Sequence, residues 1–363
     1  MSSEFIDKRA HKGRGAVSNP NGRFEATRKV GFDDGWFRDE ELSPIKTEYN
    51  PETIHSIISH NDSPDIPFSQ SINPYRGCEH GCIYCYARPT HSYWGLSGGL
   101  DFETKIFYKD EAVKYLELEL SKPSYRCEWI ALGANTDPYQ PIEKERKITR
   151  KLLEVMRRYK QPVGIVTKGS LVTRDIDILA DMAKEQLAEV TISVTTLDND
   201  LKRKLEPRAA AGEARLNAMK QLHDAGIPVG VLFAPVIPFI NDSEMETVLE
   251  RARDCGANHA GYVFLRLPYE VKDLFSEWLT AHYPLKKEHV LSLVTQARDG
   301  KLNNSEFRER MRGSGDYAEL LSQRFKLALR KFGYALPGRG HTLRTDRFKV
   351  PGRPQQIALF SLD

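Results

Sequence analysis

The chain has 363 residues, 40% of them hydrophobic, and its 53 Lys and Arg against 50 Asp and Glu give a net charge of +3. This length and apolar content suffice for one large barrel with appendages or for two domains. The sequence contains no apolar run long enough to span a bilayer and no signal-peptide pattern. Three of its five cysteines lie within one short loop, which does not suit a secreted disulfide framework. We therefore expect a soluble protein of the reducing cytoplasm.

Both ends of the sequence are basic. Residues 1–60 have several glycines and prolines and few periodic apolar positions, which predicts an irregular leader. Between positions 323 and 353, nine Lys and Arg accompany a single acid, Asp346. Such stretches could neutralise phosphates without reading a base sequence, or could be solvated tails. The basic residues of the leader are Lys8, Arg9, Lys12, Arg14, Arg23, Arg28 and Lys29.

The most informative segment places three cysteines as Cys78-x-x-x-Cys82-x-x-Cys85. Three thiolates from one loop would hold three irons of a [4Fe–4S] cube and leave the fourth iron open to a substrate or cofactor. Zinc is the alternative, because it also accepts three cysteines with a fourth ligand such as His80 or His91. The spacing therefore predicts a metal centre, with a reactive cluster as the leading hypothesis.

This spacing resembles that of the radical S-adenosylmethionine (SAM) superfamily. The resemblance implies that SAM binds the open iron of a [4Fe–4S] cluster and is reduced to a 5′-deoxyadenosyl radical. Tyr84, the aromatic residue just before the third cysteine, also fits, since in that family this side chain lies against the adenine. An electron donor such as flavodoxin or ferredoxin would be needed.

The sequence between the cysteine loop and residue 285 alternates short apolar runs with stretches of helical period. This pattern predicts strand–helix repeats around a parallel sheet, and six such units favour an open partial barrel. The predicted strands are 71–74, 128–132, 163–167, 190–195, 228–233 and 261–265. The predicted helices are 148–159, 175–187, 213–225 and 243–253. The predicted fold class is thus α/β, with a partial (β/α)6 barrel at 61–285, the leader before it and a helical extension with a basic tail at 286–363. The resemblance implies that this is a radical SAM barrel.

Further motifs resemble the branch of that superfamily containing spore photoproduct lyase and proteins labelled DNA repair photolyases. They are Thr136-Asp-Pro-Tyr-Gln140, Val166-Thr-Lys-Gly169, Glu206-Pro-Arg208 and Ala225-Gly-Ile-Pro-Val229. Because ligands of parallel barrels bind at the carboxyl ends of strands, the polar residues after each predicted strand are the candidates. The resemblance implies a lyase-like radical enzyme whose cofactor contacts include Asn135, Thr136, Asp137, Lys168, Ser193 and Arg208.

Within this set the resemblance suggests individual roles. Lys168 and Ser193 would contact the methionyl or ribose part of SAM, and Arg208 could reach the cofactor or the substrate. Each residue also has an ordinary structural interpretation. Asp137 can open a turn before Pro138, the Ser193 hydroxyl can bond backbone, and Lys168 can sit at a strand end in water.

The sequence departs from spore photoproduct lyase at one position that matters. That enzyme uses an additional cysteine near the end of its second barrel strand to donate a hydrogen atom, and this sequence has Ala134 and Asn135 there. Repair of thymine dimers is therefore not implied. Tyr139, Tyr262 or Tyr269 could supply a hydrogen atom in its place. The substrate is left open, with DNA as one possibility.

The last residues contain Gln356-Ile-Ala-Leu-Phe360, which resembles the short peptides that dock on bacterial sliding clamps. The alternative is a final strand or an apolar tail folded on the barrel. The rival for the whole chain is a non-catalytic nucleic-acid-binding protein with a structural zinc or iron–sulfur site. Cys127 and Cys255 are expected to be structural.

Overall fold

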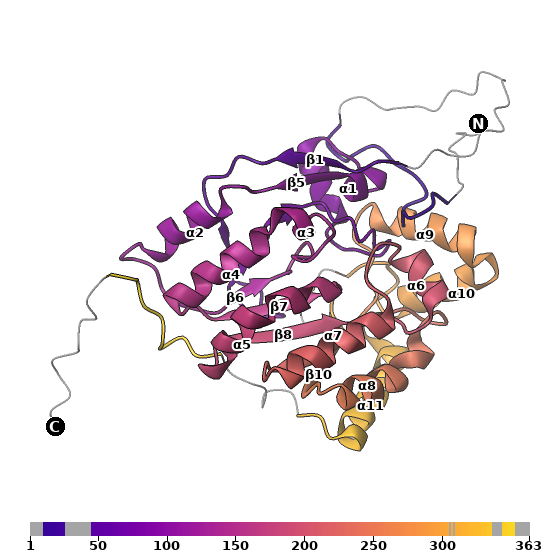
Figure 1. Ribbon diagram of the computed structural model, residues 1–363. Coiled ribbons are helices and arrows are strands. Elements are labelled where there is room, and N and C mark those ends of the chain that lie inside the picture. Colours follow the sequence, from indigo (N-terminus) through magenta and orange to yellow (C-terminus); the bar gives the residue numbers. More distant parts are fainter. Residues whose placement is uncertain (1–9, 26–44, 305, 308, 336–342, 353–363) are drawn as a thin grey trace.

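The computed structural model describes residues 10–25, 45–304, 306–307, 309–335 and 343–352 of the chain. Its main feature is a seven-stranded sheet with the order β10-β9-β8-β7-β6-β3-β2 (Figure 1). From β3 to β10 neighbouring strands are parallel, and only β2 runs antiparallel to its neighbour. The strands are β2 (Ile58–His60), β3 (Gln70–Ile72), β6 (Ile130–Leu132), β7 (Val163–Thr167), β8 (Ala188–Ser193), β9 (Val229–Val236) and β10 (His259–Phe264).

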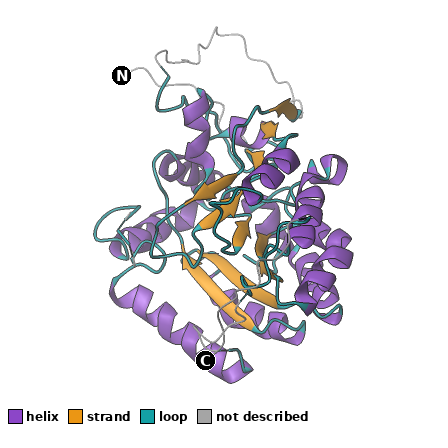
Figure 2. Ribbon diagram, turned by 90° about the vertical axis from the view of Figure 1, so that its left-hand side faces the viewer, coloured by secondary structure: helices purple, strands orange, loops and turns teal. Residues whose placement is uncertain are grey.

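Helices connect the parallel strands and surround the sheet, which runs through the centre of the molecule (Figure 2). The crossover helices are α2 (Ala112–Leu120), α3 (Glu143–Arg146), α4 (Ile148–Tyr159), α5 (Ile176–Lys184), α6 (Asn199–Leu205), α7 (Gly212–Asp224) and α8 (Met245–Asp254), with the 3₁₀ segments η2 (Ser170–Asp175) and η3 (Asp242–Glu244). The six parallel strands confirm the predicted partial barrel, which is open in the described part of the chain.

The best predicted elements are those with the clearest hydrophobic period. For β7 and α4 the predicted bounds equal the observed ones, and elsewhere in the barrel they differ by at most three residues. In α4 the residues Ile148, Leu152, Val155, Met156 and Tyr159 recur at helical spacing, and all five are buried. This stripe packs toward the sheet, so helix α4 is specified by burial of one face.

The inner strands have the apolar character of a sheet covered on both faces. Val190 and Ile192 of β8 are 0% exposed, as are Val231 and Phe233 of β9. Parallel strands that are buried on both faces form their backbone hydrogen bonds within the sheet. Their side chains contact the core on both faces, and Val, Ile and Phe therefore occupy these positions. The resulting core extends along the whole sheet.

A second, three-stranded sheet lies beside the barrel, with the order β1-β5-β4. It consists of β1 (Glu48–Pro51), β4 (Tyr75–Arg76) and β5 (Lys105–Tyr108). The cysteine loop, η1 (Arg88–Trp94) and α1 (Leu100–Thr104) lie between β4 and β5 in the chain. The sequence pattern does not predict these strands. They join the leader, the start of the cysteine loop and the segment after it into one unit.

The part of the chain after β10 forms helices and an extended tail. The helices are α9 (Val271–His282), η4 (Pro284–Lys286), α10 (Lys287–Gln296) and α11 (Gly315–Phe332). Helix α11 buries Leu321, Phe325 and Leu329 on one face, whereas its Leu320 and Leu327 are 51% and 63% exposed. No helix in the described ranges is long and apolar enough to cross a bilayer.

The tail at residues 343–352 lies at the amino ends of the barrel strands. The backbone N–H of Arg344 donates to Gln186 O and that of Lys349 donates to Tyr159 O, each at 2.9 Å. The Phe348 ring lies 5.3 Å from the ring of Tyr125. Tyr125, Tyr159 and Gln186 precede β6, β7 and β8 respectively. The tail therefore occupies the end of the barrel opposite the carboxyl ends of these strands.

Candidate active site

The three predicted ligand cysteines lie on a loop that follows β3. Cys78 and Cys82 are 7% and 8% exposed, and Cys85 is half-buried. The backbone N–H of Cys78 donates to Phe102 O at 2.9 Å, and that of Ile83 donates to Leu205 O at 3.1 Å. These two bonds fasten the loop to helices α1 and α6, which lie on either side of it.

A buried ion pair supports the loop from behind. The Arg88 guanidinium lies 2.5 Å from Glu103 Oε1, and both side chains are fully buried. Arg88 also donates to Cys82 O at 2.9 Å and to Gly81 O at 3.1 Å. A guanidinium can donate several hydrogen bonds in a fixed plane, so Arg88 holds the backbone at Gly81 and at the second cysteine, Cys82, in one conformation.

The leader docks on the same carboxylate. The N–H groups of Gly15 and Ala16 donate to the two oxygens of Glu103, each at 2.9 Å. A Cβ atom at Gly15 would lie 1.9 Å from Gly81 O, so only glycine permits this approach of the leader to the cysteine loop. Residues 10–25 are therefore part of the support of the loop.

The Thr136–Gln140 motif supports the loop from the barrel side. The Gln140 amide accepts from the N–H of Glu79 at 3.0 Å and donates to Gly77 O at 3.1 Å, so it binds the backbone on both sides of Cys78. Thr136 Oγ1 donates to Tyr75 O at 2.7 Å. The Thr136–Gln140 motif therefore supports the cysteine loop. The family resemblance alone does not indicate this role.

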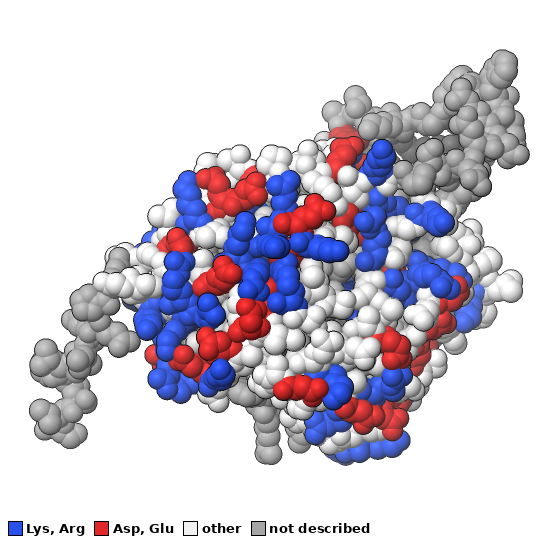
Figure 3. All heavy atoms as spheres, viewed as in Figure 1, with Lys and Arg blue, Asp and Glu red and all other residues white. Residues whose placement is uncertain are grey.

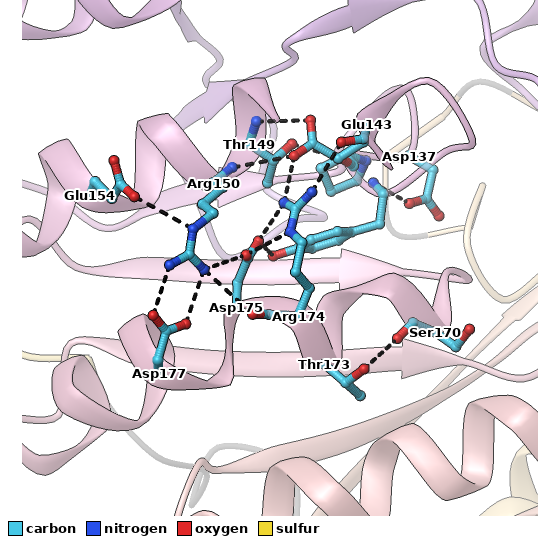
Figure 4. A network of polar contacts seen from close by, with 12 residues as sticks. Asp137, Glu143, Thr149, Arg150, Glu154, Ser170, Thr173, Arg174, Asp175 and Asp177 are labelled. Atoms are coloured by element: carbon cyan, nitrogen blue, oxygen red, sulfur yellow. Dashed lines mark hydrogen bonds and ion pairs between the residues drawn. The ribbon is translucent and has the colours of Figure 1, made fainter. Parts of the chain in front are cut away.

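An ion-pair network fixes that motif in turn (Figure 4). Tyr139 Oη donates to Asp175 at 3.1 Å, and Asp175 also accepts from Arg150 and Arg174. Arg174 reaches across to the buried carboxylate of Glu143 at 2.6 Å. The network joins α3, α4 and η2, and it lies behind the motif rather than in the site.

The three cysteines open onto one cavity of about 550 Å³ at the carboxyl ends of the strands. Of the predicted cofactor residues, Tyr84, Asn135, Asp137, Lys168 and Ser193 line this cavity, and Thr136 and Arg208 do not. Arg208 lies outside it, with its guanidinium 3.4 Å from Glu79 Oε1. The remaining lining residues are Asn61, Ser63, Ile66, Phe68, Ser71, Asn73, His80, Tyr86, Gly133, Ala134, Val166, Thr167, Leu232, Ala234, Pro235, Val263, Phe264, Leu265, Arg266, Arg310 and Met311.

Asp137 uses its carboxylate to hold the neighbouring strand end. It accepts from Thr167 Oγ1 at 2.6 Å and from the N–H of Lys168 at 2.7 Å, and His80 Nδ1 lies 3.3 Å away. Burial raises the pKa of Asp137, but His80 and these hydrogen bonds outweigh burial and hold the pKa well below its usual value. The ionised Asp137 thus positions Lys168.

Tyr84 is held by a buried polar network. Its hydroxyl donates to Glu206, which also accepts from Thr195 Oγ1 at 2.6 Å and forms an ion pair with Arg215. Arg215 in turn donates to Ser193 O at 2.9 Å. Burial raises the pKa of Glu206, but Arg215 and Lys168 overcome it, and the pKa falls to about 2. One ion pair therefore fixes two residues of the cavity wall, Tyr84 and Ser193.

On the side of the cavity near Tyr84, the Ser193 hydroxyl and the Lys168 ammonium are left without protein partners in the described part of the chain. Ser193 Oγ is buried and makes no hydrogen bond there. The Lys168 ammonium forms no ion pair with a described residue and lies 5.9 Å from the centre of the Tyr84 ring. Buried polar groups are normally satisfied, so an uncommitted hydroxyl and ammonium facing a cavity fit a polar ligand.

The pKa values of the buried thiols are raised, so these groups become thiolate ligands only when a cation is present. Burial, followed by the charge of Asp137, raises the pKa of Cys78 well above its ordinary value, and burial raises that of Cys82 to about 12. A bound metal supplies the positive charge that makes such thiols thiolates. No three His, Cys, Asp or Glu side chains in the described residues converge on a single metal-ion position. The thiolates of a cluster bind different irons and need no single point of convergence.

The structure also adds residues that sequence reasoning missed. Tyr86 lines the cavity, and its hydroxyl donates to Ala134 O. By contrast, Tyr139, Tyr262 and Tyr269, the three tyrosines considered from the sequence, do not line it. Arg266 is a further addition, since it follows β10 and faces the same cavity. Tyr86 directly follows the third cysteine, and this position in the sequence could have identified it as a candidate site residue.

The fold and the loop define the class, a partial barrel of parallel strands with a three-cysteine loop at their carboxyl ends. The chain belongs to the radical SAM superfamily, whose family model matches residues 72–252. A protein of Mycobacterium tuberculosis is 33% identical over 245 residues, which are 65% of this chain and 72% of that protein. A protein of Methanocaldococcus jannaschii is 28% identical over 213 residues, covering 59% of this chain and 76% of the relative.

Solved structures of spore photoproduct lyase share the fold. A mutant of that enzyme aligns with a TM-score of 0.55 at 15% identity, covering 80% of this chain and 79% of the other. Its complex with dinucleoside spore photoproduct aligns with a TM-score of 0.54 at 16% identity, covering 76% and 77%. The chain is thus a radical SAM enzyme with a fold similar to that of a lyase. The clamp-like peptide Gln356–Phe360 lies outside the described residues.

Proposed function

We propose that Cys78, Cys82 and Cys85 hold a [4Fe–4S] cluster and that SAM binds beside it in the cavity. The observation that carries this proposal is that the three cysteines share one cavity with the uncommitted Ser193 hydroxyl and Lys168 ammonium. When bound, the cluster and SAM supply a one-electron reductive cleavage that yields a 5′-deoxyadenosyl radical. The protein contributes binding, orientation and exclusion of water.

Each uncommitted group matches one part of the cofactor. The Lys168 ammonium is a point charge suited to the methionyl carboxylate, and the Ser193 hydroxyl can bond the ribose or the amino group. The Asn135 amide lines the same wall. Tyr84 presents a ring whose hydroxyl is tied to Glu206, so the ring has a fixed plane for the adenine. These four groups would orient the cofactor before any reaction occurs.

We further propose a nucleic acid or a nucleotide as the substrate. Three exposed aromatic rings surround Arg23, whose guanidinium carbon lies 3.9, 5.3 and 6.0 Å from the ring centres of Tyr269, Phe24 and Tyr93. Exposed aromatic rings beside a cation are typical of base-stacking surfaces. The structural relative bound to a dinucleoside lesion supports the same substrate class. On the face in Figure 3, Lys and Arg gather over α3 and α4 but are interspersed with Asp and Glu. The charges of that face alone therefore do not indicate a nucleic-acid-binding surface.

The test of the radical chemistry is an anaerobic assay. The protein is reconstituted with iron and sulfide and given SAM and dithionite, and 5′-deoxyadenosine is measured by chromatography with and without single-stranded DNA. We expect product from the wild type and none from Cys82→Ala. Cys255→Ala is the matched control, because Cys255 lies after α8 and does not line the cavity.

Metal analysis of the same preparations separates the enzyme from the rival binding protein. About four irons and four sulfides per chain would support the cluster. Tightly bound zinc without labile sulfide would instead indicate a structural site of three cysteines and a histidine. Normal product formation by Cys82→Ala would contradict the proposed ligand set.

A further inference from the structure

The cavity contains a second uncommitted cation, Arg266. It follows β10, at one edge of the parallel sheet, whereas Lys168 follows β7 in the middle of the sheet. The Arg266 guanidinium carbon lies 4.5 Å from the centre of the Tyr86 ring. Among the described residues it has no ion-pair or hydrogen-bond partner. The ring holds the guanidinium in place and leaves its five N–H donors available.

Each cation lies near the ring of a tyrosine that neighbours the third cysteine in the chain. Lys168 lies over Tyr84 and Arg266 over Tyr86, and these two tyrosines flank Cys85 in the sequence. SAM has one carboxylate, which one cation can neutralise. Lys168 is the nearer match, because it shares its wall with Ser193 and the Tyr84 ring. Arg266 is left for an anion that the cofactor does not supply.

The wall around Arg266 carries more positive charge than one carboxylate can balance. Arg310 lines the same cavity and pairs with Asp65 at 2.5 Å. Arg298 lies behind them and donates to the carbonyl oxygens of Phe264, Leu265 and Arg310. Among the described residues, Asp65 is the one carboxylate paired with any of the three arginines. Burial, followed by the charge of Arg310, lowers the pKa of Arg266.

The lining on this side comes from segments outside the cysteine loop. Asn61, Ser63 and Phe68 belong to the connection between β2 and β3, and Met311 follows Arg310 in the segment before α11. Ser63 accepts a hydrogen bond from Arg310, which ties the two segments together. Polar side chains and one aromatic ring beside an unpaired guanidinium form a wall suited to a polar, anionic ligand.

From these observations we propose that Arg266 binds a phosphate group of the substrate while Lys168 holds the carboxylate of SAM. The inference rests on the proposed function, since it assigns Lys168 to the cofactor. A guanidinium binds phosphate through two parallel hydrogen bonds, and the surplus positive charge favours a phosphate over a singly charged carboxylate. The phosphate could belong to a nucleic-acid strand or to a free nucleotide. Arg266 would thereby place the substrate beside Cys85.

The test measures the preference for phosphate with probes that differ only in charge. The full chain, reconstituted anaerobically and saturated with SAM, is titrated with a fluorescent single-stranded deoxyoligonucleotide and with its uncharged methylphosphonate counterpart. Thymidine 5′-monophosphate and thymidine serve as the small pair. The first pair reports a strand as the source of the phosphate, and the second pair reports a nucleotide.

The variants are Arg266→Gln, Arg266→Lys and the control Arg251→Gln. Arg251 pairs with Glu213 on the surface of α8, outside the cavity, so its replacement removes the same charge elsewhere. We expect the wild type to bind at least one phosphate-bearing probe more tightly than its neutral counterpart. In Arg266→Gln that preference should fall about tenfold or more, and in Arg266→Lys it should fall less, because the charge remains. Arg251→Gln should match the wild type, and SAM affinity should change less than about twofold in all three.

Several outcomes would overturn the inference. If the wild type shows no preference for either phosphate-bearing probe, the inference is wrong, whatever the variants show. An unchanged preference in Arg266→Gln would show that Arg266 does not bind the phosphate. If the electron paramagnetic resonance signal of the cluster changed in the same variant, the role of Arg266 would be to balance the charge of the cluster. A loss of SAM affinity would assign it to the cofactor. Formation of 5′-deoxyadenosine in the same preparations tests the proposed function separately, so phosphate binding without this product would contradict only the radical chemistry.

Discussion

His91 illustrates how the environment of one residue sets its ionisation. Its Nε2 lies 3.1 Å from Lys105 O, so Nε2 carries the hydrogen, and its Nδ1 has no partner among the described residues. Burial is the largest cause that lowers the pKa of His91, to about 4 from an ordinary value of 6.5. The folded protein therefore keeps His91 neutral over a range in which the unfolded chain binds a proton.

This shift predicts a loss of stability in mild acid. Because the folded pKa is the lower one, the unfolded state takes up the proton between about pH 6.5 and 4, and the free energy of unfolding falls as the pH drops through that window. Between pH 7.5 and 5 the expected loss is about 2 kcal/mol. Anaerobic denaturant unfolding at the two pH values measures it. His91→Gln should lose this component and the exposed His55→Gln should retain it, so an equal pH dependence in His91→Gln would contradict the assignment.

At this scale the sequence predicted residue types better than residue roles. The cysteines, Tyr84, Lys168 and Ser193 lie around the cavity, because each lies at or after the carboxyl end of a strand that meets that edge. Thr136 follows β6 and Arg208 follows α6, but their side chains turn to Tyr75 O and Glu79. The direction of a side chain in a loop depends on partners far away in the sequence, which local pattern does not contain.

At the scale of elements, the cysteine loop is held by three separate segments. Helix α1 supplies Glu103, the 3₁₀ segment η1 supplies Arg88, and the loop after β6 supplies Gln140. All three bind backbone groups of the loop or the residues that do so. The loop therefore takes its shape from its neighbours, and the conformational entropy of ordering it is already lost before a cluster binds.

Gln140 offers the cleanest test of this support. Gln140→Ala leaves Gly77 O and the N–H of Glu79 without partners in a buried place, which costs about 1–3 kcal/mol for each group. We expect faster loss of iron to a chelator, by about tenfold or more, with the barrel still folded by circular dichroism. Gln296→Ala is the matched control, because Gln296 ends α10 and bonds only Ser292 in an exposed position. Equal iron retention in the two variants would show that the motif does not support the loop.

The elements also show which patterns a sequence reveals. The barrel strands and α4 have clear periods and were predicted within three residues. The three-stranded sheet was missed because β4 has two residues and β5 has four, which is too short for alternation to be recognised. Its register depends on pairing between the leader and segments more than fifty positions away, such as Glu48 with Lys105.

At the scale of the whole molecule, the leader packs against the cysteine loop and the segments around it. Ala16 and Val17 are 1% and 2% exposed and belong to the main core, and Arg14 donates to Glu103 O at 3.0 Å and to Ile45 O at 2.6 Å. The leader thus completes the covering of the cysteine loop rather than forming a separate unit. The integrity of the site should depend on residues more than sixty positions before the first cysteine.

Gly15→Ala tests that dependence. A Cβ atom there would meet Gly81 O at 1.9 Å, so the leader must move away and Glu103 loses two N–H donors. We expect the free energy of unfolding to fall by about 2–4 kcal/mol and iron retention to fall with it. Denaturant unfolding and iron analysis measure the two effects. Lys12→Ala, an exposed change in the same leader, should alter neither, and a Gly15→Ala protein as stable as this control would show that the leader is not a support.

The anchored tail has a consequence for how the molecule could be held. Residues 343–352 are fastened at the amino ends of β6, β7 and β8, and the cavity opens at the carboxyl ends of the same strands. A partner that binds residues 343–352 would therefore approach from the end of the barrel opposite the cavity. The protein could then be tethered to a larger assembly and still bind a bulky substrate, because the tail and the cavity opening lie at opposite ends of the barrel strands.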